Sequence, residues 1–98
     1  MIIQDYVNKG LKSVKNDMGE IRKTRVEDRY ISIIFPNGWV GSIVIDPIYG
    51  NAKYSVAVCD YNGYFNWEIL KPFCDDKGTI LCNSEKEVCE ALSVIEAL

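Results

Sequence analysis

The residue types that usually perform catalysis are thinly represented in this chain of 98 residues. There is no histidine, so neither a Ser–His nor a Cys–His nucleophile pair can form. The seven glycines stand singly at turns or within β-rich runs and make no phosphate-binding loop. Adjacent carboxylates such as Asp75 and Asp76 lie in a loop pattern, where aspartate usually forms turns. The sequence therefore predicts a protein that is not an enzyme.

The cysteines are candidates for a metal site or for disulfide bonds. Cys59, Cys74, Cys82 and Cys89 lack the two-to-four-residue spacing of a zinc knuckle. The N-terminus has no basic segment before an apolar one, so we expect no export signal, a cytoplasmic location and no disulfides. Cys59 and Cys89 sit in apolar patterns and are predicted to be small buried residues. We expect no metal and no other cofactor.

A basic cluster is the first candidate binding surface. Residues 20–29 are the most polar stretch and carry Arg22, Lys23, Arg25 and Arg29. The whole chain has a net charge of −3, which disfavours general nucleic-acid binding because phosphate contacts need dense positive charge. One interpretation of the cluster is a solvated edge. The other is a contact for an acidic partner or a nucleic-acid backbone.

Aromatic residues at predicted turns form the second candidate surface. Tyr49, Tyr61, Tyr64 and Trp39 fall at or near turns, and Asp60 is expected at their rim. Tyrosine and tryptophan are enriched at the residues that dominate binding energy in interfaces. The alternative is that each of them packs over a sheet edge. As a group they predict a partner-binding surface.

The central stretch must position both surfaces. Four β-rich runs, over 30–35, 39–45, 54–59 and 65–70, are separated by turn residues that include Asn37-Gly38 and Asn62-Gly63. In each run large apolar residues alternate with smaller or polar ones. This pattern predicts an antiparallel meander with one covered face and one partly open face.

Two amphipathic segments can cover the apolar face. Apolar spacing from Ile3 to Ile21 predicts a helix over 2–18, and a capping box at Ser84 and Glu87 predicts a helix over 85–97. Residues 79–82 are expected to form a short fifth strand, and 20–29 a twisted strand or connector, with extension of the first helix as the alternative. The predicted fold is one α+β domain over 1–98. It has an N-terminal helix, a four- to five-stranded antiparallel meander and a C-terminal helix, with both helices on one face of the sheet.

The size, the helix–meander–helix layout and the ending from Ser84 to Leu98 are similar to those of small accessory proteins of phages and prophages in low-GC bacteria. Such proteins include anti-CRISPRs and other inhibitors of host defence, which act by binding. The resemblance implies a phage-encoded inhibitor that occludes the surface of a larger host protein or ribonucleoprotein in the host cytoplasm. It assigns a role to no particular residue.

Other functions stay open at this point. One is a small-ligand or nucleotide-binding protein with a pocket between sheet and helix, and another is a nucleic-acid contact through 22–29. Homodimerisation through a sheet edge or the open face is also expected, because so small a β-rich chain has apolar surface to cover. The longest apolar runs fall well short of the roughly 20 residues of a membrane span, so we expect no membrane insertion.

Overall fold

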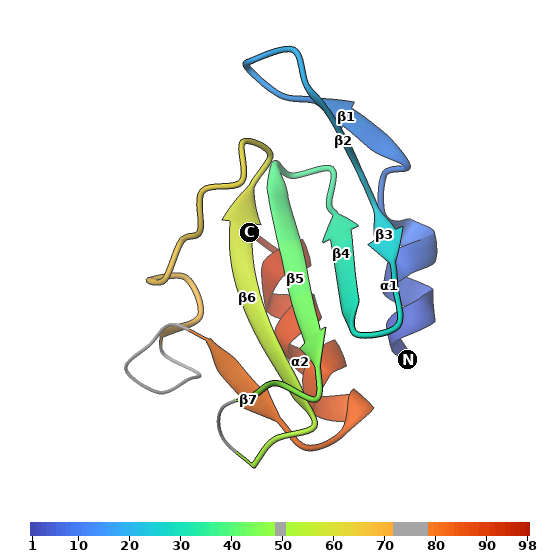
Figure 1. Cartoon of the computed structure of the whole chain (residues 1–98), viewed down its shortest axis with the longest axis vertical. Coiled ribbons are helices and arrows are strands. Elements are labelled where there is room, and N and C mark those ends of the chain that lie inside the picture. Colours follow the sequence, from blue (N-terminus) through green and yellow to red (C-terminus); the bar gives the residue numbers. More distant parts are fainter. Residues whose placement is uncertain (49–50, 72–78) are drawn as a thin grey trace.

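A computed structural model describes residues 1–48, 51–71 and 79–98. The elements in chain order are α1 (Ile3–Lys9), β1 (Ser13–Lys15), β2 (Ile21–Lys23), β3 (Arg25–Val26), β4 (Tyr30–Ile34), β5 (Trp39–Ile45), β6 (Tyr54–Asp60), β7 (Ile80–Cys82) and α2 (Glu85–Glu96). Strands β3 to β7 form a five-stranded antiparallel sheet in chain order, and β1 pairs with β2 in a separate hairpin (Figure 1). The predicted α+β fold with an antiparallel meander is confirmed.

Both helices pack on one face of the sheet, as predicted. Ile33, Ile43 and Val58 point from the central strands into a core that they share with Leu92 of α2. A Cβ atom added at Gly41 would lie 2.8 Å from Cδ2 of Leu92. Helix α2 therefore packs directly on the backbone of β5, and Gly41 permits this close approach.

Helices α1 and α2 run side by side in the same direction. At their first turns the backbone N–H of Ile3 donates to Oε1 of Glu85 at 2.8 Å. At their last turns Nζ of Lys9 lies 3.9 Å from Oε1 of Glu96. Nδ2 of Asn37, in the β4–β5 turn, donates to the Ile95 carbonyl at 2.8 Å and so joins this turn to the C-terminal end of α2.

The capping box predicted at the start of α2 is half confirmed. Oγ of Ser84 accepts from the backbone N–H of Glu87 at 3.3 Å, as expected for an N-cap. The Glu87 carboxylate, however, accepts from the N–H of Asn83 at 2.9 Å and not from that of Ser84. The Glu87 side chain thus bonds a backbone N–H one residue earlier in the chain than the capping-box motif implies.

The predicted helix over 2–18 is wrong in length, because α1 ends at Lys9. Gly10 adopts an extended conformation, with φ −67° and ψ 156°, and the chain continues into the β1–β2 hairpin. At the tip, Oδ1 of Asn16 accepts from the N–H groups of Met18 at 3.0 Å and Glu20 at 2.9 Å. Such local side-chain bonds compete with helix formation. The apolar spacing does not reflect burial here, since Met18 is 73% exposed.

The predicted fourth strand over 65–70 is also wrong. Phe65 makes only an isolated bridge to Cys59, and turns follow it. Oδ1 of Asn66 accepts from the N–H groups of Glu68 at 3.0 Å and Ile69 at 3.2 Å, which bends the chain away from the sheet. The place beside β6 is taken by β7, the strand predicted as the fifth. Residues 20–29 form β2 and the edge strand β3, in agreement with the favoured interpretation.

Candidate functional site

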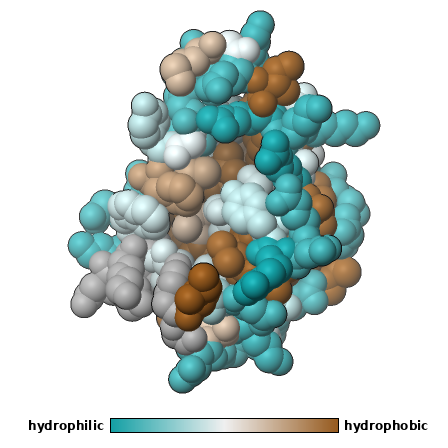
Figure 2. Space-filling view, viewed as in Figure 1, coloured by the Kyte–Doolittle hydropathy of each residue, from teal (hydrophilic) through white to brown (hydrophobic). Residues whose placement is uncertain are grey.

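The face of the sheet opposite the helices is the candidate site, and we call it the open face. The strand register gives the residues that point away from the helices. They are Tyr30, Ser32 and Ile34 of β4, Val40, Ser42 and Val44 of β5, and Ser55, Ala57 and Cys59 of β6. Figure 2 shows this side of the molecule, with apolar atoms at its centre between polar side chains. A second apolar cluster of Ile34, Val40 and Cys59 lies at one end of this face.

The β1–β2 hairpin, residues 13–23, covers that end, and we call it the arm. Leu11 and Val14 pack on the second cluster from the arm and its base. The arm leaves the sheet at Thr24, whose hydroxyl donates to the Leu11 carbonyl at 2.6 Å and accepts from the N–H of Ile34 at 3.1 Å. The N–H of Leu11 donates to the Ile34 carbonyl at 2.8 Å. Thr24 therefore joins the base of the arm to the edge of β4.

The tip of the arm is fixed to the turn after β6. The N–H of Asp17 donates to Oδ1 of Asn62 at 3.1 Å, and Nδ2 of Asn62 donates back to Oδ2 of Asp17 at 3.0 Å. Gly63 has a φ of 86°, which glycine adopts without strain and which closes this turn. The arm is thus held at both ends and forms a wall beside the open face.

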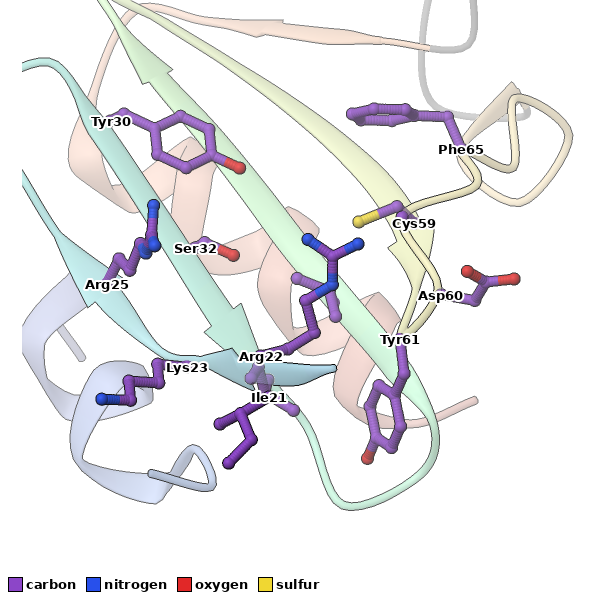
Figure 3. Close-up of a pocket in the computed structure, with 13 residues that line it drawn as sticks. Ile21, Arg22, Lys23, Arg25, Tyr30, Ser32, Cys59, Asp60, Tyr61 and Phe65 are labelled. Carbon is purple, nitrogen blue, oxygen red and sulfur yellow. The ribbon is translucent and has the colours of Figure 1, made fainter. Parts of the chain in front are cut away.

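A pocket of about 220 Å³ lies between the arm, the sheet and the turn. Its lining comes from all three: Ile21, Arg22, Lys23, Arg25, Tyr30, Ser32, Ile34, Val40, Cys59, Asp60, Tyr61, Gly63 and Phe65. In Figure 3 the Arg22 side chain reaches across the sheet toward Cys59, and the Arg25 side chain extends toward Tyr30. Lys23 points away from Arg22 in the same view.

The pocket is positively charged, because three basic residues line it and Asp60 is its one acidic residue among those described. Oδ1 of Asp60 accepts from the N–H groups of Asn62 at 2.9 Å and Tyr64 at 3.0 Å, so this carboxylate holds the turn. Arg22 approaches the carboxylate of Glu20 only at 3.9 Å, and both side chains are about half exposed. Such an exposed pair is weak and leaves the guanidinium available to a partner.

A stacked aromatic pair stands at the rim of the pocket. The rings of Phe65 and Trp67 lie 5.0 Å apart between centroids with an interplanar angle of 6°. Phe65 is 45% exposed and Trp67 is 48% exposed. Sequence reasoning missed this pair because it placed both residues on the apolar face of a strand. The signal that could have found it is Asn66, a turn-forming residue between two aromatics.

The predicted basic cluster is divided by the structure. Arg22, Lys23 and Arg25 line the pocket. Arg29 lies outside that lining, and its Nη2 donates to the Asp46 carbonyl at 2.6 Å. That bond joins the β3–β4 turn to the end of β5 and accounts for Arg29 without a partner.

The predicted aromatic surface is divided as well. Tyr61 and Asp60 line the pocket, and the Tyr61 hydroxyl donates to the Phe35 carbonyl at 2.5 Å. Tyr64 is 71% exposed and lies outside the pocket lining. Trp39 packs against the core on the helix-covered face and is half-buried. Tyr49 lies outside the described residues.

Cys59 lies at the base of the pocket but is a poor nucleophile. Burial raises the pKa of its thiol to about 11, and the neighbouring Asp60 carboxylate adds to this rise while Arg22 opposes it. The thiol therefore stays protonated near neutral pH. Cys59 and Cys89 are buried, as predicted, and Cys74 lies outside the described residues.

The predicted ligand pocket between sheet and helix has a different character. A groove of about 390 Å³ runs between β7 and α2, lined by Ile80, Leu81, Glu87, Glu90, Ala91 and Val94. Its two carboxylates would repel the phosphates of a nucleotide. Within residues 1–48, 51–71 and 79–98, no group of three Cys, Asp or Glu side chains could hold a metal ion. No helix in the described part of the chain is long and apolar enough to cross a membrane.

Comparison with protein-family models, with curated proteins and with solved structures finds no match for this chain.

Proposed function

We propose that this protein is a non-enzymatic binding module that docks on a larger protein through the pocket of the open face and acts by occluding that partner's surface. The observation that carries the proposal is that basic and aromatic side chains from distant parts of the chain line one pocket. The arm and the edge strand β3 bring Arg22 and Arg25 to the same pocket as Tyr61 and Phe65, although these pairs are about forty residues apart in the chain.

The size of the pocket supports docking over enclosure of a small ligand. Sites that enclose drug-sized ligands are typically about 300–1,000 Å³, whereas this pocket holds about 220 Å³. It has room for one or two side chains of a partner. Exposed aromatic residues and arginine beside it are the residue types that contribute most to protein–protein binding energy.

The resemblance to phage accessory proteins supports a host defence complex as the partner. An inhibitor that acts by occlusion needs a rigid surface and no catalytic group. The arm, fixed at Thr24 and at Asn62, supplies rigidity to this face. Preorganised side chains lose less conformational entropy on binding.

Affinity capture from a bacterial host lysate, followed by quantitative mass spectrometry, tests the proposal. The wild type is compared with an Arg22→Ala/Arg25→Ala variant and with Lys12→Ala/Lys15→Ala. The second variant removes two positive charges from the same arm and its base, outside the pocket lining. We expect a captured protein to be lost with the arginine variant and retained with the lysine variant.

A matched aromatic comparison separates the pocket from the rest of the surface. Phe65→Ala is expected to weaken capture, whereas Tyr64→Ala is expected to leave it unchanged, since Tyr64 is exposed outside the pocket. Capture that survives both the arginine and the Phe65 changes would show that docking does not use this site.

A further inference from the structure

We infer that the pocket recognises an acidic–aromatic segment of polypeptide, in which a carboxylate enters between Arg22 and Arg25 and a neighbouring aromatic side chain packs on Phe65. This inference rests on the proposed function and names the chemistry of the partner. It is carried by the positions of two guanidinium groups, the Ser32 hydroxyl on the floor and the exposed aromatic stack.

The charged half of the site suits a carboxylate. Arg22 and Arg25 both extend over the open face from the arm and from β3 (Figure 3). Arginine presents a planar fork that binds a carboxylate through two parallel hydrogen bonds. Neither Lys23 nor Arg25 makes an ion pair with any residue in the described ranges. Ser32 lies on the floor between the two arginines and offers a hydroxyl donor.

The apolar half of the site suits a planar side chain. Trp67 covers one face of Phe65 and holds its ring at the rim. The pocket side of Phe65 is available, because Phe65 lines the pocket and is 45% exposed. An aromatic side chain stacked there would extend an existing pair to three rings. Aromatic pairs contribute about 0.5–1.5 kcal/mol beyond their buried area, which corresponds to a roughly two- to tenfold change in affinity.

The distribution of charge favours a polypeptide over a nucleic acid. Glu20 of the arm lies 3.9 Å from Arg22, Asp17 is bonded to Asn62 beside the pocket, and Asp60 at the end of β6 lines it, so acidic side chains border the basic residues. A nucleic-acid strand carries a phosphate at every nucleotide and would meet these carboxylates as it left the pocket. The whole chain also carries a net charge of −3. A polypeptide with one or two carboxylates can place them at the arginines and leave uncharged residues beside the acidic border.

Fluorescence anisotropy with three labelled probes tests the inference on the full chain. The probes are a short peptide in which glutamate alternates with tyrosine, a peptide of equal length in which serine replaces tyrosine, and an oligodeoxythymidine of similar charge. We expect the glutamate–tyrosine peptide to bind several-fold tighter than the glutamate–serine peptide. Arg22→Ala/Arg25→Ala should weaken its binding by more than about tenfold, and Lys12→Ala/Lys15→Ala by much less.

Each other result overturns the inference in an identifiable way. Equal binding of the two peptides would contradict the inference that an aromatic side chain of the partner packs on Phe65. Arginine-dependent binding of oligodeoxythymidine at equal or higher affinity would assign the pocket to nucleic acid. If neither peptide binds while lysate capture still depends on Arg22 and Arg25, this chemistry is wrong and the proposed docking function stands. Thermal unfolding of each variant checks that these exposed substitutions leave the fold intact.

Discussion

The two faces of the sheet differ in how completely their side chains are covered. On the covered face, Ile33, Ile43 and Val58 are fully buried against α2, and Gly41 lets Leu92 reach the backbone of β5. On the open face, Ser32, Ser42 and Ser55 alternate with the larger residues of the covered face, and the buried apolar cluster of Ile34, Val40 and Cys59 lies where the arm covers it. The first face has the close packing of a core, whereas the second retains a pocket.

The difference shows how one sheet can provide both stability and a binding surface. Most of the hydrophobic free energy comes from the face that α1 and α2 complete. The arm contributes little to that core, and instead it carries charged side chains over the other face. Exposed residues of the pocket such as Arg22 and Arg25 can therefore vary at small cost in stability, which is typical of binding sites placed on a rigid scaffold.

The largest expected effect separates the faces by stability. Leu92→Ala removes a fully buried side chain and should lower the free energy of unfolding by about 2–5 kcal/mol. Ile21→Ala removes an apolar side chain that is 64% exposed on the arm, and should change it by no more than about 0.5 kcal/mol. Urea unfolding measures both. Comparable losses would contradict the view that the covered face carries the stability.

The meander is the part of the fold that the sequence predicts best. Alternation over 30–59 places Ile31, Ile33 and Val56 on one face, which a one-residue slip would expose, and glycines at 38 and 63 supply the positive φ that their turns need. The helix over 85–97 was likewise predictable from its cap and apolar stripe.

The arm and the aromatic stack do not follow from apolar periodicity, because both depend on local side-chain bonds. Asn16 and Asn66 each accept two backbone N–H groups and turn the chain where apolar periodicity alone indicates a helix or a strand. These local turns bring together residues that are far apart in the sequence. The arm brings Arg22 to Cys59 and Gly63, a juxtaposition that no spacing in the sequence encodes.

The second prediction compares how well each face shields a cysteine thiol from water, as measured by the pKa of that thiol. Burial raises the pKa of Cys59 on the open face and of Cys82 on the covered face from 9.0 to about 11. Both thiols keep their protons in the folded state when the unfolded chain has begun to lose them. The contribution of each buried thiol to the free energy of unfolding is therefore fully present below about pH 9. It is lost as the pH rises toward 11, by on the order of 2 kcal/mol for each thiol.

Single replacements isolate each thiol in this pH dependence. Cys59→Ala and Cys82→Ala should each remove part of the decline between about pH 9 and 11, measured by urea unfolding across that range. Other titrating groups are common to all variants and cancel in the comparison. A Cys59→Ala variant that retains the full decline would mean that water reaches the thiol on the open face, and that the arm seals this end of the sheet less well than α2 seals the other.

The smallest effect concerns the attachment of the arm at Thr24. Thr24→Val keeps the shape of the side chain but removes the hydroxyl that joins the Leu11 carbonyl to the N–H of Ile34. Part-buried groups then lose their partners, so the free energy of unfolding should fall by about 1–2 kcal/mol. Faster hydrogen exchange at the Ile34 amide should accompany the loss. Amides of the covered strands should be affected only through the change in global stability.

Thr24→Ser is the matched control, because it retains the hydroxyl and removes only the methyl group. If the hydrogen bonds hold the arm, the valine variant is the less stable of the two and alone exposes the Ile34 amide. A serine variant that is equally or more destabilised would assign the attachment to packing of the methyl group. In that case the arm would be held by the same kind of contact as the covered face, and the contrast between the two faces would be one of degree.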